Sequence, residues 1–230
     1  MRYARLGTLW AVSVPVRLEP ASRWYLAAEF VVVFFGLVTA YTLLWRGTSP
    51  IPVLLVLGAA VVWHLWRTGF DRRSFWRPEA LRGQWRPMLT LWTLTAAGCA
   101  AAVAVLTPDA LLVLPREQPL LWAAVVVFYP LLSVYPQELL FRAFLFHRYE
   151  PVFGPTGTVA AGAVAFGFVH IAFGNWVAVA LSAAGGAVFA ARYRETRSLL
   201  VVSVEHALYG LLMFTIGLGR YFYHGGVTAS

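Results

Sequence analysis

The sequence predicts an all-α fold: a polytopic membrane bundle of about seven transmembrane helices, with its N-terminus in the cytoplasm. Three observations support this prediction. Hydrophobic residues make up 60% of the 230 residues and charged residues only 12%, whereas an ordinary soluble domain has roughly 25% charged residues. Long apolar runs recur between short segments that contain Arg, Pro and Gly. The arginines concentrate in alternate segments, as expected for membrane orientation.

The apolar runs define the expected helices. A transmembrane helix needs about 20 apolar residues, with about 17 as the usual minimum, so the second and sixth runs are short. The fourth run contains Pro130 and Pro136, which predict a kink or a break. The expected helices span residues 24–45, 51–66, 88–106, 120–146, 156–173, 176–191 and 199–219.

The arginine distribution predicts the orientation. The net charge of +8 would also suit a nucleic-acid-binding protein, but short basic segments between apolar runs set membrane topology instead. We therefore expect membrane lipid as a partner and no nucleic acid. The expected location is the bacterial cytoplasmic (inner) membrane. With the N-terminus inside, the cytoplasmic segments hold Arg2, Arg5, Arg17, Arg23, Arg67, Arg72, Arg73, Arg77, Arg82, Arg86, Arg148, Arg192, Arg194 and Arg197, and the outer segments hold only Arg46, Arg116 and Arg220.

The chain divides into three expected parts. Residues 1–23 form a cytoplasmic or interfacial N-terminal segment, and residues 24–119 form the N-terminal transmembrane helices. Residues 120–224 form a helical core that carries the candidate functional residues. The basic stretch 67–86, which contains several aromatic residues, is expected on the cytoplasmic lipid headgroups.

Four ionisable residues interrupt the apolar runs of this core: Glu138, Arg142, His170 and His206. Such a residue at membrane depth costs at least about 2.5–3.5 kcal/mol, so each is a candidate functional residue. At about 1.5 Å per helical residue, Glu138 lies about 15 Å from the cytoplasmic end of its run, His206 about 14 Å and His170 about 22 Å. All three depths fall in the middle half of a slab about 30 Å thick, so the side chains are able to share one cavity.

Structural roles also fit these residues. Glu138 and Arg142 have the i, i+4 spacing of an ion pair that stabilises a helix bundle. Either histidine is able to serve as a hydrogen-bonding residue between helices. Glu205 precedes His206 directly, and successive helical residues point about 100° apart, so the two need not face the same cavity.

Taken together, the four residues indicate hydrolytic chemistry. A carboxylate beside two imidazoles is able to activate a water molecule and to stabilise the oxyanion of a tetrahedral intermediate. The same set is also able to bind a divalent metal ion that lowers the pKa of its water, so a divalent metal is a possible cofactor. Both arrangements favour hydrolysis of an amide bond.

Three short motifs in this region resemble the CAAX-protease and bacteriocin-processing (CPBP or Abi) family of intramembrane proteases. The family pattern E-E-x-x-x-R reads Gln137, Glu138 and then Arg142 here, F-x-x-x-H is matched from Phe166 to His170, and the third motif begins at His206. The resemblance covers roughly residues 120–224. It implies a catalytic-type helical core and identifies Glu138, Arg142, His170 and His206 as catalytic residues.

Two positions depart from the family pattern. Gln137 replaces the first glutamate, which the resemblance identifies as the base that activates water, and an amide cannot accept that proton. Gly210 stands where the third motif has Asn or Asp. If the activity is retained, the base has moved to Glu138 or Glu205.

The sequence therefore favours an intramembrane endopeptidase, glutamate-type or metal-assisted, that acts on a membrane-associated protein or peptide. The alternative is a catalytically inactive relative that serves as a membrane scaffold or immunity-type protein, as Gln137 and Gly210 would allow. A small transporter that relays protons through buried Glu and His is a third class, but the apolar runs show no paired halves of the kind many transporters have.

Overall fold

The structure, a computed structural model, describes residues 22–45 and 47–222, which form helices joined by short turns, without a strand in these ranges. This confirms the all-α prediction. Residues 1–21 of the predicted N-terminal segment lie outside the described residues. Among the described residues, five helical stretches are long and apolar enough to cross a membrane, and a shorter apolar helix spans Ile51–Arg67; the five are Arg23–Leu44, Pro78–Leu106, Pro119–Phe173, Trp176–Thr196 and Leu199–Ile216.

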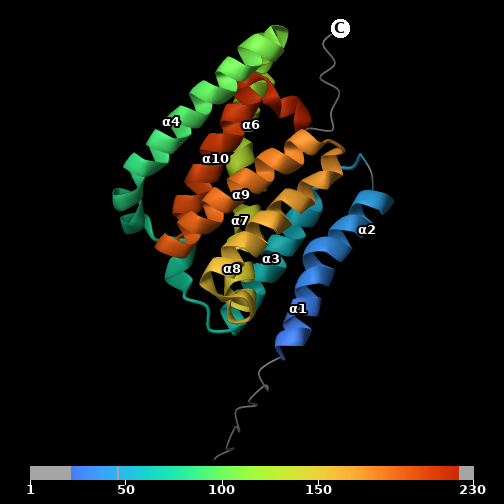
Figure 1. Cartoon of the computed structure of the whole chain (residues 1–230), viewed down its shortest axis with the longest axis vertical. Coiled ribbons are helices and arrows are strands. Elements are labelled where there is room, and N and C mark those ends of the chain that lie inside the picture. Colours follow the sequence, from blue (N-terminus) through green and yellow to red (C-terminus); the bar gives the residue numbers. More distant parts are fainter. Residues whose placement is uncertain (1–21, 46, 223–230) are drawn as a thin grey trace, which may run out of the picture.

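The fold is therefore a polytopic membrane bundle. Figure 1 shows α1 beginning at one end of the molecule and α10 ending at the other. This arrangement agrees with an odd number of crossings. The number seven, the cytoplasmic N-terminus and the division of the chain at residue 119 stay predictions.

The first helices form one side of the bundle. Ser22 caps the first of them, because its side chain accepts a hydrogen bond from the backbone N–H of Tyr25. The ring of Phe30 lies 5.3 Å from that of Tyr149 and 5.0 Å from that of Phe153, so this helix packs against α8. The elements are α1 (Arg23–Val31), η1 (Val32–Gly36), α2 (Leu37–Leu44) and α3 (Ile51–Arg67).

The basic stretch 67–86 folds into two short helices before a long helix at the edge of the bundle. Arg77 joins this stretch to the connection between α9 and α10: its Nη1 donates to the carbonyl oxygen of Thr196 over 3.3 Å, and its own carbonyl accepts from the Ser198 hydroxyl over 3.1 Å. The elements of this region are η2 (Arg72–Phe75), η3 (Pro78–Ala80), α4 (Leu81–Leu106), η4 (Pro108–Ala110) and α5 (Val113–Glu117).

The next stretch is helical but irregular. Its prolines do not break it; instead, two π-helical turns lie on either side of Glu138. Turns of this kind bend helices and are frequent at functional sites. The helical geometry fails only at Gly154, whose φ of 68° and ψ of 170° lie outside the helical region. The elements are α6 (Pro119–Tyr129), η5 (Pro130–Val134), α7 (Tyr135–Glu138), η6 (Leu139–Phe144) and α8 (Leu145–Val169).

The last helices pack closely through small residues, as their composition predicts. A Cβ atom at Gly167 would lie 2.7 Å from the Cβ of Ala183, so the backbones of α8 and α9 approach each other only because position 167 has no side chain. Figure 1 shows these two helices side by side, with α10 next to α9 and α4 beyond it. The elements are η7 (His170–Phe173), α9 (Trp176–Thr196), α10 (Leu199–Ile216) and η8 (Leu218–Tyr221).

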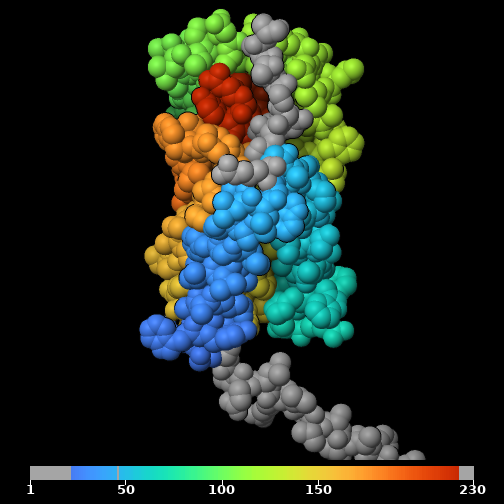
Figure 2. Space-filling model, turned by 90° about the vertical axis from the view of Figure 1, so that its right-hand side faces the viewer, coloured from blue at the N-terminus to red at the C-terminus, as the bar shows by residue number. Residues whose placement is uncertain are grey.

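The outer surface is apolar over much of its area. Large hydrophobic side chains are exposed on α2, α3, α4 and α6, which is the surface that lipid covers in a membrane protein. Figure 2 shows one such face, with α1 and α2 running up its middle beside α3. The buried core gathers instead on α7, α8, α9 and α10, where the candidate site lies.

Candidate active site

Glu138 and His206 are in direct contact. The Nδ1 atom of His206 lies 2.8 Å from the Oε1 atom of Glu138, so α10 and α7 meet at this pair. Glu138 is fully buried and His206 is only 5% exposed. Because an ionised carboxylate only accepts hydrogen bonds, Nδ1 carries the hydrogen that it donates. The opposite nitrogen, Nε2, is then the acceptor of the neutral ring.

Arg142 balances the charge of Glu138. Its Nε atom lies 3.1 Å from Oε2 of the carboxylate, and both side chains are completely buried. This contact is an ion pair without the alignment of a hydrogen bond. The guanidinium also donates from Nη1 to the carbonyl oxygen of Phe141 over 2.9 Å and lies 5.2 Å from the centre of the Phe166 ring. The predicted i, i+4 pair is therefore formed, between the last residue of α7 and the π-helical turn η6.

His170 lies where α8 ends. Its Nδ1 atom is 2.7 Å from the carbonyl oxygen of Phe166, and a carbonyl oxygen can only accept, so Nδ1 carries the hydrogen. In the neutral ring Nε2 is then an acceptor. The ring of Phe166 lies 5.0 Å from the imidazole of His170 and 5.3 Å from that of His206. The two predicted histidines therefore approach the same aromatic side chain.

One large cavity connects these residues. Its volume is about 780 Å³, and it is lined by His170, His206, Gln137 and Tyr129 among many apolar side chains. Glu138 is not among the lining residues, because its two oxygens face His206 and Arg142. Of the predicted site residues, His170 and His206 line the cavity, whereas Glu138 and Arg142 do not.

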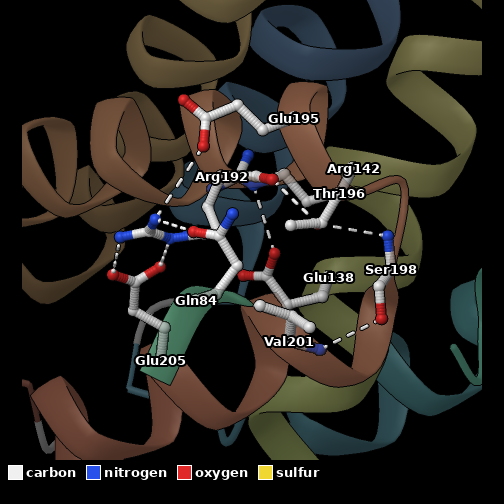
Figure 3. Close-up of polar contacts among 9 residues, drawn as sticks. All are labelled: Gln84, Glu138, Arg142, Arg192, Glu195, Thr196, Ser198, Val201 and Glu205. Atoms are coloured by element: carbon white, nitrogen blue, oxygen red, sulfur yellow. Dashed lines mark hydrogen bonds and ion pairs between the residues drawn. The ribbon is translucent and has the colours of Figure 1, made fainter. Parts of the chain in front are cut away.

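Glu205 does not join this group. Its carboxylate accepts two hydrogen bonds from the guanidinium of Arg192 on α9 (Figure 3). The Nε–Oε2 and Nη2–Oε1 distances are 2.9 and 3.1 Å. Arg192 also donates to Gln84. Glu205 is fully buried and neutralised by this pair, so it is occupied on another side of α10.

The possible metal site has too few ligands in the part of the chain that the structure describes. No three His, Cys, Asp or Glu side chains in residues 22–45 and 47–222 are grouped so that they could hold a metal ion. Glu138 and His206 are hydrogen-bonded to each other.

Part of the chain that contains these residues matches the model of a known protease family. Residues 117–212 match the model of the family described as type II CAAX prenyl endopeptidase Rce1-like. This chain carries an Rce1-like segment. The match confirms the predicted resemblance, and the segment contains all four predicted site residues. No curated protein and no solved structure matched the chain in the same comparisons.

The first departure from the family pattern, Gln137, lies in the Rce1-like segment at the wall of the cavity. Gln137 lines the cavity, and its Nε2 atom donates to the Ser133 hydroxyl over 2.7 Å. The side chain is therefore held by its own helix, at the place where the pattern expects a carboxylate. It adds an amide to the cavity wall but no base.

The Rce1-like segment also contains one polar contact that the sequence analysis missed. The hydroxyl of Tyr129 lies 3.2 Å from Nε2 of His206, and the ring lines the same cavity. Tyr129 lies in an apolar run directly before Pro130 and belongs to none of the three motifs. The only available signal was a phenolic hydroxyl within a membrane segment, which usually finds a hydrogen-bond partner when buried.

Proposed function

We propose that this chain is an intramembrane endopeptidase that hydrolyses a peptide bond in a membrane-associated protein or peptide. One observation carries the proposal: a buried carboxylate, Glu138, holds Nδ1 of His206, whose imidazole lines a cavity that His170 also lines. A carboxylate that orients an imidazole in this way stabilises the cation formed when the ring takes up a proton. The Rce1-like match supports the same class of reaction.

In this proposal His206 is the base and Glu138 acts through it. The Nε2 atom removes a proton from a water molecule, whose oxygen attacks the carbonyl carbon of the scissile bond. Glu138 stabilises the resulting imidazolium, and Arg142 is the counter-charge of Glu138. When the intermediate collapses, the C–N bond breaks and His206 returns the proton to the leaving amine. This assignment differs from the sequence-based hypothesis, in which Glu138 or Glu205 contacts the water directly.

His170 has a separate part in the proposed reaction. Its Nδ1 hydrogen is bound to the carbonyl of Phe166, so the Nε2 lone pair is available to the cavity. That atom is able to accept the second hydrogen of the attacking water and to orient the oxygen toward the substrate. The mostly apolar walls of the cavity suit a substrate that enters from the bilayer.

The proposal is tested by comparing protein termini in membranes that contain the wild-type protein with those that contain His206→Ala or His170→Ala. We expect new termini with the wild type and their loss in both variants. His64→Ala serves as a matched control, because this histidine packs against Phe144 and does not line the cavity. Equal termini in all four samples would reject the peptidase and favour an inactive membrane scaffold.

A second arm addresses the metal-assisted alternative. In the proposal Glu138 and His206 work through a mutual hydrogen bond, so cleavage should persist after treatment with a chelator and exhaustive dialysis. Loss of cleavage with the chelator, and its recovery on adding one divalent metal, would replace the glutamate–histidine mechanism with metal-assisted hydrolysis.

A further inference from the structure

The side chain of Tyr129 occupies the volume that any side chain at position 210 would fill. A Cβ atom built on Gly210 would overlap with the hydroxyl oxygen, Cε1 and Cζ of Tyr129. Gly210 follows His206 by four residues on α10, so both positions are on the same face of that helix. Both also line the cavity. The glycine is thus what allows the tyrosine, which comes from α6, to approach His206.

The polarity of the contact follows from the tautomer of His206. Because Nδ1 donates its hydrogen to Glu138, Nε2 of the neutral ring has a lone pair and no hydrogen. The hydroxyl of Tyr129, 3.2 Å away, therefore donates to Nε2. The two rings also meet edge to face, with centroids 6.2 Å apart. The imidazole is held from both sides, by a carboxylate and by a phenol.

We propose that Tyr129 is the polar partner of His206 in this site and supplies the donor that a side chain at position 210 would otherwise supply. Its role in hydrolysis rests on the proposed function. The attacking water takes the place of the hydroxyl at Nε2, and the released O–H donates a hydrogen bond to the substrate oxygen. While the new C–O bond forms, the carbonyl electrons move onto that oxygen, His206 takes the proton of the water, and Tyr129 keeps its own proton.

The contact itself is tested without any substrate. Diethyl pyrocarbonate modifies unprotonated imidazoles, and mass spectrometry of the purified full chain in detergent gives the rates at His206 and His170 separately. A net hydrogen bond of about 0.5–1.5 kcal/mol corresponds to a rate ratio of about 2- to 13-fold. We expect Tyr129→Phe to raise the His206 rate by this factor while the His170 rate, the internal control, stays constant. If Tyr129→Phe leaves the ratio of the His206 rate to the His170 rate unchanged, Tyr129 is not the hydrogen-bond partner of His206.

The competition between Tyr129 and a side chain at position 210 for the same volume is tested by a pair of substitutions. Gly210→Asn alone should lower the melting temperature in detergent, because its side chain collides with the tyrosine ring. Adding Tyr129→Ala should restore the melting temperature and keep His206 as slowly modified as in the wild type, since the new carboxamide lies beside Nε2. If Gly210→Asn is tolerated beside an intact Tyr129, the two side chains do not compete and the proposal fails.

The role of Tyr129 in hydrolysis is tested with the substrate that the comparison of protein termini identifies. We expect Tyr129→Phe to lower kcat by about 100-fold or more, the typical loss for one oxyanion donor, with KM nearly unchanged. An unchanged kcat would remove the oxyanion role. A wild type that cleaves nothing would reject the proposed function instead, and the rates of modification would still decide whether Tyr129 is the partner of His206.

Discussion

Glu205 and His206 are consecutive residues of α10 that bind two different helices. Glu205 pairs with Arg192 of α9, and His206 contacts Glu138 of α7. Because neighbouring residues of a helix point about 100° apart, one turn of α10 holds both a structural ion pair and the candidate catalytic pair. The two acidic residues that were alternative bases in the sequence analysis are separated by this geometry.

The first prediction follows from that separation. Glu205→Gln should leave the cleavage rate per folded molecule within about twofold of the wild type, since Glu205 lies away from the cavity. Glu138→Gln should lower the rate by about 100-fold or more, the range of a lost acid–base contribution. The measurement is cleavage normalised to folded protein. A larger loss with Glu205→Gln than with Glu138→Gln would contradict the role of Glu138 as the carboxylate that acts through His206.

The second prediction concerns the buried pair of Glu138 and Arg142. Glu138→Ala leaves a guanidinium with 0% exposure without its counter-charge, and should destabilise the protein by about 3–5 kcal/mol. Glu138→Leu together with Arg142→Met should cost less than either single change, because no unpaired charge remains. Unfolding in detergent measures both. Additive losses in the double variant would show that the two side chains do not form a coupled pair.

The third prediction concerns the close approach of α8 and α9. A side chain at Gly167 would lie 2.7 Å from the Cβ of Ala183 and 3.2 Å from the carbonyl oxygen of Val179. Gly167→Val should therefore destabilise the bundle by about 1–3 kcal/mol and reduce cleavage, because His170 follows three residues later. Gly98→Ala on α4 is the control, since nothing lies within 4 Å of its added methyl group. Equal melting temperatures for the two variants would contradict the packing.

The fourth prediction uses Cys99, the single cysteine of the chain, which lines the cavity with the two histidines. A bulky maleimide on this thiol should block substrate entry and abolish cleavage. The same reagent should have no effect on Cys99→Ser, whose activity before treatment should equal that of the wild type. Cleavage that survives complete modification of the thiol would show that the substrate does not use this cavity.

Much of the fold was predictable because hydrophobicity alone determines where a chain is able to cross a membrane. The apolar run 51–66 corresponds to the helix Ile51–Arg67, and the run 199–219 corresponds to Leu199–Ile216 with the short turn after it. The effect of the prolines was not predictable. Pro130 begins a π-helical turn and does not end the helix, whereas the interruption falls at Gly154, where the backbone adopts a positive φ. Local backbone geometry of this kind depends on packing against neighbouring helices.

The composition of the candidate site was predictable from the burial cost of its residues, but its connections were not. Depth along the helices placed Glu138 and His206 at nearly the same level, and the two are in contact. Depth carries no rotational information, so it could not show that Glu138 faces away from the cavity or that Glu205 faces Arg192. The contact of Tyr129 was missed because it depends on the missing side chain of Gly210, whose volume the tyrosine ring occupies. The sequence shows the glycine but not which side chain lies against it.

The π-helical turn η5 makes the site depend on the length of the chain as well as on its composition. Tyr129 and Glu138 are nine positions apart, and at about 100° per residue they would lie on opposite sides of a regular α-helix. The turn between them changes that rotation, and both side chains reach the same imidazole. Insertion of one further residue into 130–134 would therefore turn one of the two away, with every atom of the site still present.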